Sequence, residues 1–139
     1  MRILAVDPGG RRLGLAVADA LTGLATPLEV LAHHGLEAAA RSIVEIARRQ
    51  GAERVVIGLP TDAEGRETPA CARSHALARE IARLGVATEL QPEHLSSDEA
   101  RRRARAAGRA AARPVDDLAA QVIAEDWLAR AGSAPGDPC

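Results

Sequence analysis

The chain has 139 residues, 47% of them hydrophobic and 27% charged, which is typical of one globular domain with a single core. All 18 basic residues are arginine, which excludes a Walker-type phosphate lysine and Schiff-base chemistry. One tryptophan and no phenylalanine or tyrosine disfavour nucleic-acid recognition by aromatic stacking. No apolar run approaches the length of a membrane span or signal peptide, so we expect a cytoplasmic protein without membrane contacts. Its two cysteines form neither a disulfide framework nor a metal site.

The first third of the chain predicts three antiparallel strands, at residues 2–7, 12–19 and 25–31. The first strand ends in Asp7, and the following Pro8-Gly9-Gly10 predicts a tight turn into the second. The second strand alternates large with very small side chains, so we expect another element to pack closely against its bare face.

The rest of the chain alternates helical and strand patterns, which predicts a mixed sheet covered by helices. We therefore expect an α/β fold with five strands, in which strands four and five run parallel to strand one. Residues 1–131 would form the single domain, and residues 132–139, which include Cys139, a disordered tail. The expected elements are a helix that starts at Leu36 and ends just before Gly51, a strand at 54–58, a helix that starts at Pro69 and is stopped by Gly85, a strand at 86–91, a helix starting at the capping box Ser96-Ser97-Asp98-Glu99, and a helix from Pro114 to about Ala131.

Positive charge is concentrated between Ala100 and Pro114, a segment with six arginines and no acidic residue. The remainder of the chain carries 12 basic and 19 acidic residues. Such a basic segment on an acidic body is suited to binding phosphate groups, although a solvated helix face is an equally good explanation from composition alone. The six are Arg101, Arg102, Arg103, Arg105, Arg109 and Arg113.

Acidic residues occur where the predicted strands end. Asp7 ends strand one, Glu93 follows strand five, and Gly58-Leu59-Pro60 ends the strand expected between them. Because the crevice of an open α/β sheet lies at the carboxyl ends of its strands, we expect these three strand ends to lie side by side.

The last helix offers a third carboxylate, at Asp116 or Asp117. Asp116 shares a face with the apolar residues of this helix and would therefore point toward the sheet, where a carboxylate is costly unless something compensates it. Asp117 instead aligns with Gln121, Ala124 and Glu125, which we expect to face solvent. We select Asp116 and interpret Asp117 as a first-turn acid that favours the helix dipole.

Three carboxylates in one crevice, with glycines beside them, are suited to Mg²⁺ or Mn²⁺ serving phosphoryl chemistry. The alternative is that these acids form salt bridges with nearby arginines such as Arg11 and Arg12.

Four segments in order resemble the YqgF/RuvX family of small RNase H-like proteins, described as pre-16S rRNA nucleases or Holliday-junction resolvase homologues. The segments are residues 7–19, Gly58-Leu59-Pro60, Glu93 with Leu95-Ser96-Ser97, and Val115 to Ala120, so the resemblance covers nearly the whole chain.

The resemblance implies an RNase H-like fold and divalent-metal-dependent hydrolysis of phosphodiester bonds in ribosomal RNA precursors. It gives Asp7, Glu93 and Asp116 the catalytic, metal-binding places. The expected partner is RNA, either pre-rRNA or the ribosome that carries it, or branched DNA, bound by a monomer or homodimer. The candidate substrate-binding residues are Gly9, Arg11, Arg12, Gly58, Pro60, Arg101, Arg102 and Arg105.

The chain departs from the family pattern at two places. It has Pro92-Glu93-His94 where the family usually has Asp-Glu-Arg, and Thr61-Asp62 where Leu-Asn is usual. Pro92 and His94 favour one alternative, a non-catalytic RNA- or ribosome-binding protein; a resolvase for branched DNA is another. An actin-like ATPase or sugar kinase is disfavoured, because such proteins enclose a nucleotide between two domains.

Overall fold

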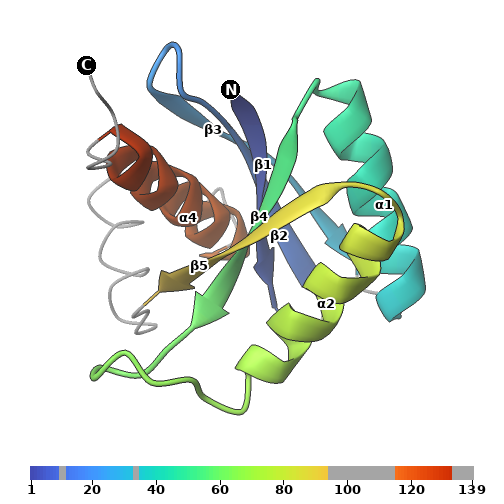
Figure 1. Cartoon of the computed structure of the whole chain (residues 1–139), viewed down its shortest axis with the longest axis vertical. Helices are drawn as coiled ribbons and strands as arrows, with labels where there is room; N and C mark the ends of the chain where they lie inside the picture. The colour runs from blue at the N-terminus through green and yellow to red at the C-terminus, as the bar shows by residue number, and fades with distance from the viewer. Residues whose placement is uncertain (10–11, 33–34, 94–114, 133–139) are drawn as a thin grey trace.

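A computed structural model describes residues 1–9, 12–32, 35–93 and 115–132, and it excludes the side chains of residues 115–118. The five strands form one sheet in the order β3-β2-β1-β4-β5 (Figure 1). The bounds are β1 Arg2–Pro8, β2 Arg12–Asp19, β3 Leu24–Ala32, α1 Leu36–Arg49, β4 Arg54–Pro60, α2 Cys71–Arg83, β5 Ala87–Glu93 and α4 Val115–Gly132.

The strand directions confirm the predicted mixed sheet. β1 pairs with β2, and β2 with β3, in antiparallel directions, whereas β1, β4 and β5 are mutually parallel. Since β4 lies between β1 and β5, the carboxyl ends of all three parallel strands meet at one edge of the sheet, as predicted.

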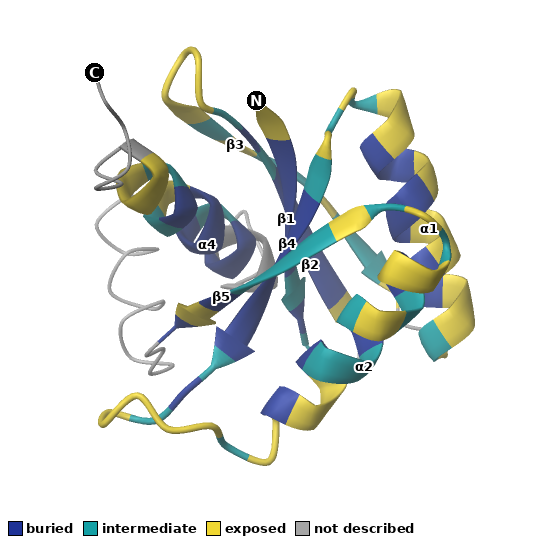
Figure 2. Ribbon diagram, in the orientation of Figure 1, coloured by how far each residue is buried: buried dark blue, intermediate teal, exposed yellow. Residues whose placement is uncertain are grey.

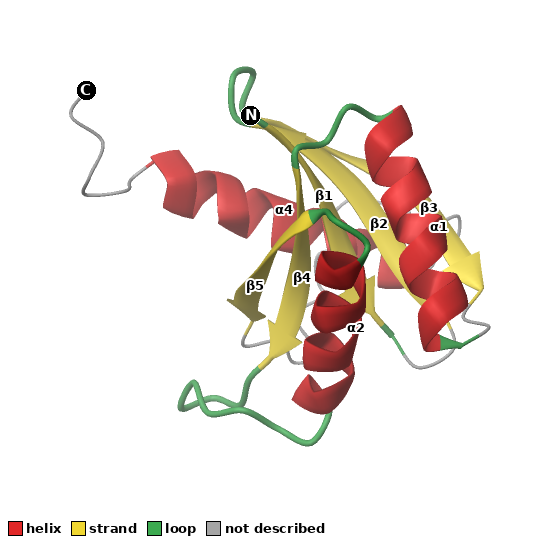
Figure 3. Cartoon of the chain, turned by 45° about the vertical axis from the view of Figure 1, so that its right-hand side comes forward, coloured by secondary structure: helices red, strands yellow, loops and turns green. Residues whose placement is uncertain are grey.

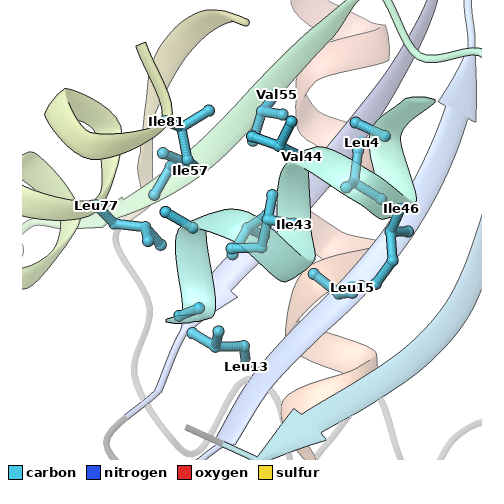
Figure 4. Packing of buried hydrophobic residues seen from close by; sticks show 14 residues of the cluster. Leu4, Leu13, Leu15, Ile43, Val44, Ile46, Val55, Ile57, Leu77 and Ile81 are labelled. Carbon is cyan, nitrogen blue, oxygen red and sulfur yellow. The ribbon is translucent and has the colours of Figure 1, made fainter. Parts of the chain in front are cut away.

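Helices cover both faces of the sheet (Figure 3). α1 and α2 pack on one face around large aliphatic side chains, which Figure 4 shows between α1 and the strands. α4 packs on the other face, where Ile3, Ala5, Ala16 and Val56 lie against the residues of the helix. In Figure 2 the central strands are coloured mostly as buried, and α1, α2 and α4 each contain both buried and exposed residues.

The small residues of β2 allow α4 to lie close to the sheet. Ala16 and Ala18 are fully buried in the cluster that contains Ile123 and Trp127. This confirms the prediction that another element packs against the bare face of the second strand. Large side chains at these positions would hold the helix away.

Two details of the predicted helices are wrong. Ala124 of α4 is fully buried rather than facing solvent, because the helix crosses several strands and buries more than one narrow stripe. The helix predicted to start at Pro69 begins instead at Cys71, with Ala70 exposed at its N-cap. The predicted helix at the capping box, the arginine-rich segment and Cys139 lie outside the described residues.

Gly58 of β4 lies in close contact with Ile123 of α4. A Cβ at this position would lie 2.5 Å from Cδ1 and 3.2 Å from Cγ1 of Ile123. Ile123 is fully buried, so it has little freedom to move aside.

Gly58→Ala is expected to destabilise the protein by about 1–3 kcal/mol, because the added methyl overpacks this contact. Ile123→Val removes Cδ1, the atom in the closest contact, and should therefore recover part of this loss in the double variant. Urea unfolding of the wild type, both single variants and the double variant measures the coupling between the two positions. Strictly additive costs would contradict a steric origin.

Candidate active site

The side-chain alternation of the strands places Asp7 and Glu93 on the same face of the sheet. Ile3 and Ala5 of β1 belong to the cluster under α4, and Asp7 follows them at the same two-residue spacing. On β5, Glu89 forms an ion pair with Arg130 of α4, and Glu93 lies on the same side four residues later. Both candidate carboxylates therefore lie on the α4 face at the carboxyl ends of their strands.

The two carboxylates differ in exposure. Asp7 is half-buried at the end of β1, and Glu93 is only 3% exposed. β4 separates their strands, so the two backbones are roughly 10 Å apart at the usual strand spacing. Burying an acidic side chain such as Glu93 is costly unless its charge is compensated, and a cation at the strand ends would compensate it.

The first turn of α4 begins near the same edge of the sheet. Along the helix, Ile123 lies over Gly58 near the carboxyl end of β4, whereas Arg130, about two turns later, pairs with Glu89 nearer the amino end of β5. The helix therefore runs away from the carboxyl edge, which puts the backbone of Asp116 in its first turn on the side of that edge (Figure 1). The side chains of Asp116 and Asp117 are outside the described part, so the choice between them stays a prediction.

Side chains from α2 and the loop before it hold the end of β4 in place. The buried hydroxyl of Ser74 donates a 2.7 Å hydrogen bond to the carbonyl of Gly58. Thr68 Oγ1 and Cys71 Sγ donate to the carbonyl of Pro60 at 2.7 and 3.2 Å. Because paired carbonyls fix the backbone of β4, these residues fix the surface between Asp7 and Glu93. The sequence signal for Ser74 was its position as a serine on the apolar stripe of a helix.

The departure Thr61-Asp62 has a local structural role. The Thr61 amide donates to the carbonyl of Glu93 at 3.0 Å. Asp62 Oδ1 accepts hydrogen bonds from the amides of Glu64 and Arg66 at 3.0 and 2.8 Å. An asparagine oxygen could accept the same two bonds, so this departure preserves the turn that follows β4.

The predicted substrate-binding residues differ in how exposed they are. Gly9 is half-buried and its amide donates to the carbonyl of Asp7 at 2.9 Å, which closes the turn beside the candidate carboxylate. Arg12 is exposed at the start of β2, and Pro60 is half-buried. Gly58 is buried beneath Ile123, so its missing side chain makes room for α4 rather than for a substrate. The remaining candidates, Arg11, Arg101, Arg102 and Arg105, lie outside the described residues.

The donor set suits a hard divalent cation. Both described candidates are carboxylates, which Mg²⁺ and Mn²⁺ prefer, and the amide oxygen of Gln91, Oε1, is buried on the same face without a hydrogen-bond partner in the described part. Among side chains that the structure describes, no group of three His, Cys, Asp or Glu residues could hold a metal ion. A three-acid centre therefore depends on the last helix.

A separate hollow of about 430 Å³ lies on the opposite layer, between α1 and α2. It is remote from the strand ends where the carboxylates lie, and its charged residues are on the solvated face of α1, so we do not assign it to the site. Its lining residues are Arg41, Val44, Glu45, Arg48, Arg49 and Leu84.

A five-stranded mixed sheet, with acidic side chains at the carboxyl ends of β1 and β5 and a helix across the same face, defines an RNase H-like protein. A family model described as "RuvX: Holliday junction resolvase" matches residues 1–130. The chain therefore belongs to the RuvX family, a family of nucleases that hydrolyse phosphodiester bonds.

Individual proteins of known name or structure are also similar to this chain. A protein of Anaeromyxobacter dehalogenans (strain 2CP-C) named "Putative pre-16S rRNA nuclease" is 40% identical over 134 residues, which cover 94% of this chain and 98% of that protein. A protein of the same name from Anaeromyxobacter sp. (strain Fw109-5) is 40% identical over 132 residues, covering 92% and 96%. The solved structure of T. thermophilus RuvC in complex with a Holliday junction substrate matches with a TM-score of 0.61 at 22% identity, covering 95% of this chain and 96% of that one, which shows the shared fold.

Within the described ranges, no helix has both the length and the apolar character needed to cross a lipid bilayer.

Proposed function

We propose that this protein is a divalent-metal-dependent nuclease that cleaves RNA during processing of the pre-16S ribosomal RNA, in the cytoplasm. The observation that carries this proposal is the position of Asp7 and Glu93 on the α4 face, at the carboxyl ends of strands separated only by β4. The names of relatives at 40% identity favour ribosomal RNA as the substrate.

In this proposal Asp7, Glu93 and Asp116 would hold Mg²⁺ or Mn²⁺, which would activate water and stabilise charge at the phosphorus. The protein would contribute the arrangement of these groups: β1 and β5 orient two carboxylates, and α4 would supply the third. Gly9, Arg12 and Pro60, together with Arg11, Arg101, Arg102 and Arg105, would contact the phosphate backbone beside them. Guanidinium groups suit this task because one guanidinium can donate two parallel hydrogen bonds to the oxygens of one phosphate.

A second candidate function is resolution of branched DNA. The description of the family model and the shared fold with RuvC favour it. This reaction requires cleavage of two strands and therefore a symmetric dimer, whereas trimming an RNA end requires only a monomer.

Cleavage of a substrate panel distinguishes these functions. The wild-type protein is incubated with Mn²⁺ and either a fragment spanning the pre-16S rRNA end, an unrelated single-stranded RNA, or a four-way DNA junction, and EDTA is added to a matched set. We expect Mn²⁺-dependent cleavage of the pre-rRNA fragment at the highest rate. Preferential cleavage of the junction would replace the first proposal with the second, and RNA binding without cleavage would indicate a non-catalytic protein.

A further inference from the structure

Gln91 of β5 has a buried amide oxygen without a hydrogen-bond donor among the described residues. The residue is 7% exposed, and its Oε1 atom has no hydrogen-bond partner in the described part of the protein. Its Nε2 atom has a long contact of 3.5 Å with the carbonyl of Pro92. An unpaired buried acceptor destabilises the folded protein, and an apolar side chain of the same size would not.

The strand register places this amide within the candidate site. Gln91 pairs in register with Gly58 of β4, and Glu93 follows two residues later on the same face. Gly58 follows the last registered pair between β1 and β4, Val6 with Ile57, so it is level with Asp7. Gln91 therefore lies in the row of the sheet that contains Asp7 and is the nearest residue to Glu93 on that face of β5.

The neighbouring acid on the other side of Gln91 is already engaged elsewhere. Glu89 pairs with Arg54 at 2.8 Å and also with Arg130 of α4. These two ion pairs compensate the charge of Glu89, which precedes Gln91 on the same face. The amide of Gln91 therefore lies between the paired Glu89 and the candidate carboxylate of Glu93. The unpaired oxygen is therefore on the strand segment that leads into the site.

We propose that Gln91 is a positioning residue for the cation: its Oε1 accepts a hydrogen bond from a water molecule of the hydration shell of the bound Mg²⁺ or Mn²⁺. This inference rests on the proposed metal-dependent function. Mg²⁺ in particular keeps several of its waters when it binds protein carboxylates, and those waters donate hydrogen bonds. A neutral amide oxygen accepts such a bond without adding a fourth negative charge to the site.

The test is a thermal melt at increasing Mn²⁺ concentration, without nucleic acid. Gln91→Met replaces the amide with an apolar side chain of similar length. Without cation this variant should melt at the wild-type temperature or above it, because the unpaired acceptor is gone. The Mn²⁺ concentration that gives half of the maximal shift should rise about tenfold, the size of effect found when a residue behind a metal ligand is removed.

Gln121→Met is the matched control. Gln121 is a half-buried glutamine of α4 whose Nε2 contacts the carbonyl of Ala25 at 3.5 Å on β3, the outer strand on the opposite side of the sheet from β5. The same substitution there should leave the half-saturating Mn²⁺ concentration unchanged. Gln91→Glu, which restores an acceptor oxygen, should recover Mn²⁺ binding and also lower the melting temperature without cation, because it adds a negative charge beside Glu93.

Two results would overturn the inference, and they have different meanings. If Gln91→Met and the wild type respond equally to Mn²⁺ while Asp7→Asn does not respond, Gln91 has no role and the metal site stands. If the wild type itself shows no Mn²⁺ response, both the proposed metal site and the role of Gln91 are wrong.

Discussion

Replacement of Asp7 by asparagine is expected to reduce Mn²⁺-dependent cleavage by about a thousandfold or more while the fold is retained. Asparagine has the same shape but no charge, and a bound metal contributes several kcal/mol of transition-state stabilisation, with tenfold in rate for each 1.36 kcal/mol. The backbone of Asp7 remains paired with Gly14 of β2, so the strand end should not move. Single-turnover cleavage of the pre-rRNA fragment at saturating Mn²⁺ measures the effect.

Asp19→Asn is the control for this prediction. Asp19 is also an aspartate at a strand end, but it belongs to the antiparallel β2, whose carboxyl end lies at the opposite edge of the sheet. Its Oδ1 accepts a 2.9 Å hydrogen bond from the amide of Leu21. This variant should cleave at the wild-type rate. An Asp7→Asn protein that kept more than a tenth of the wild-type rate would show that Asp7 is not a metal-binding catalytic residue.

Replacement of Trp127 by alanine is expected to destabilise the protein by about 3–5 kcal/mol, the usual cost of removing a buried aromatic side chain. Trp127 is 5% exposed and packs in the cluster that joins α4 to the sheet. It is the only tryptophan, so urea unfolding of the wild type and the variant should be followed by far-ultraviolet circular dichroism rather than by fluorescence.

Leu21→Ala provides the comparison, because Leu21 is 88% exposed in the turn between β2 and β3. Its substitution should change the free energy of unfolding by no more than about 0.5 kcal/mol. If Trp127→Ala cost less than about 1 kcal/mol, α4 would not be firmly attached to the sheet. The proposal that this helix fixes a third carboxylate over the strand ends would then lose its structural basis.

The sequence predicted the order and type of the described elements because their patterns are local. A continuous apolar run marks β1, alternation of large and small side chains marks β2, and helical spacing from Leu36 onward marks α1. Gly51 and Gly85 end the patterns of α1 and α2 as expected, and both have positive φ. Parallel pairing of β1, β4 and β5 followed from the helices between successive strands, since such connections return the chain in the same direction.

The sequence also placed Asp7 and Glu93 at the ends of parallel strands, and this prediction needed only topology. It could not show that Glu93 is almost fully buried, because burial depends on the elements that cover β5. The solvent-facing position predicted for Ala124 was wrong for a similar reason. A helix that crosses several strands buries a wide face, and its crossing is set by packing rather than by its own periodicity.

Sequence alone therefore determined the sheet order, the direction of the strands and the family, because strand patterns and motif order are properties of the chain. Only the tertiary structure showed why residue 58 is glycine, with Ile123 filling the space of its missing side chain. Only the structure showed that Ser74 holds the carbonyl of Gly58 and that Gln91 buries an unpaired oxygen next to a candidate catalytic acid. These contacts join residues 16 to 65 positions apart or depend on what covers a strand, and no local pattern in the sequence encodes them.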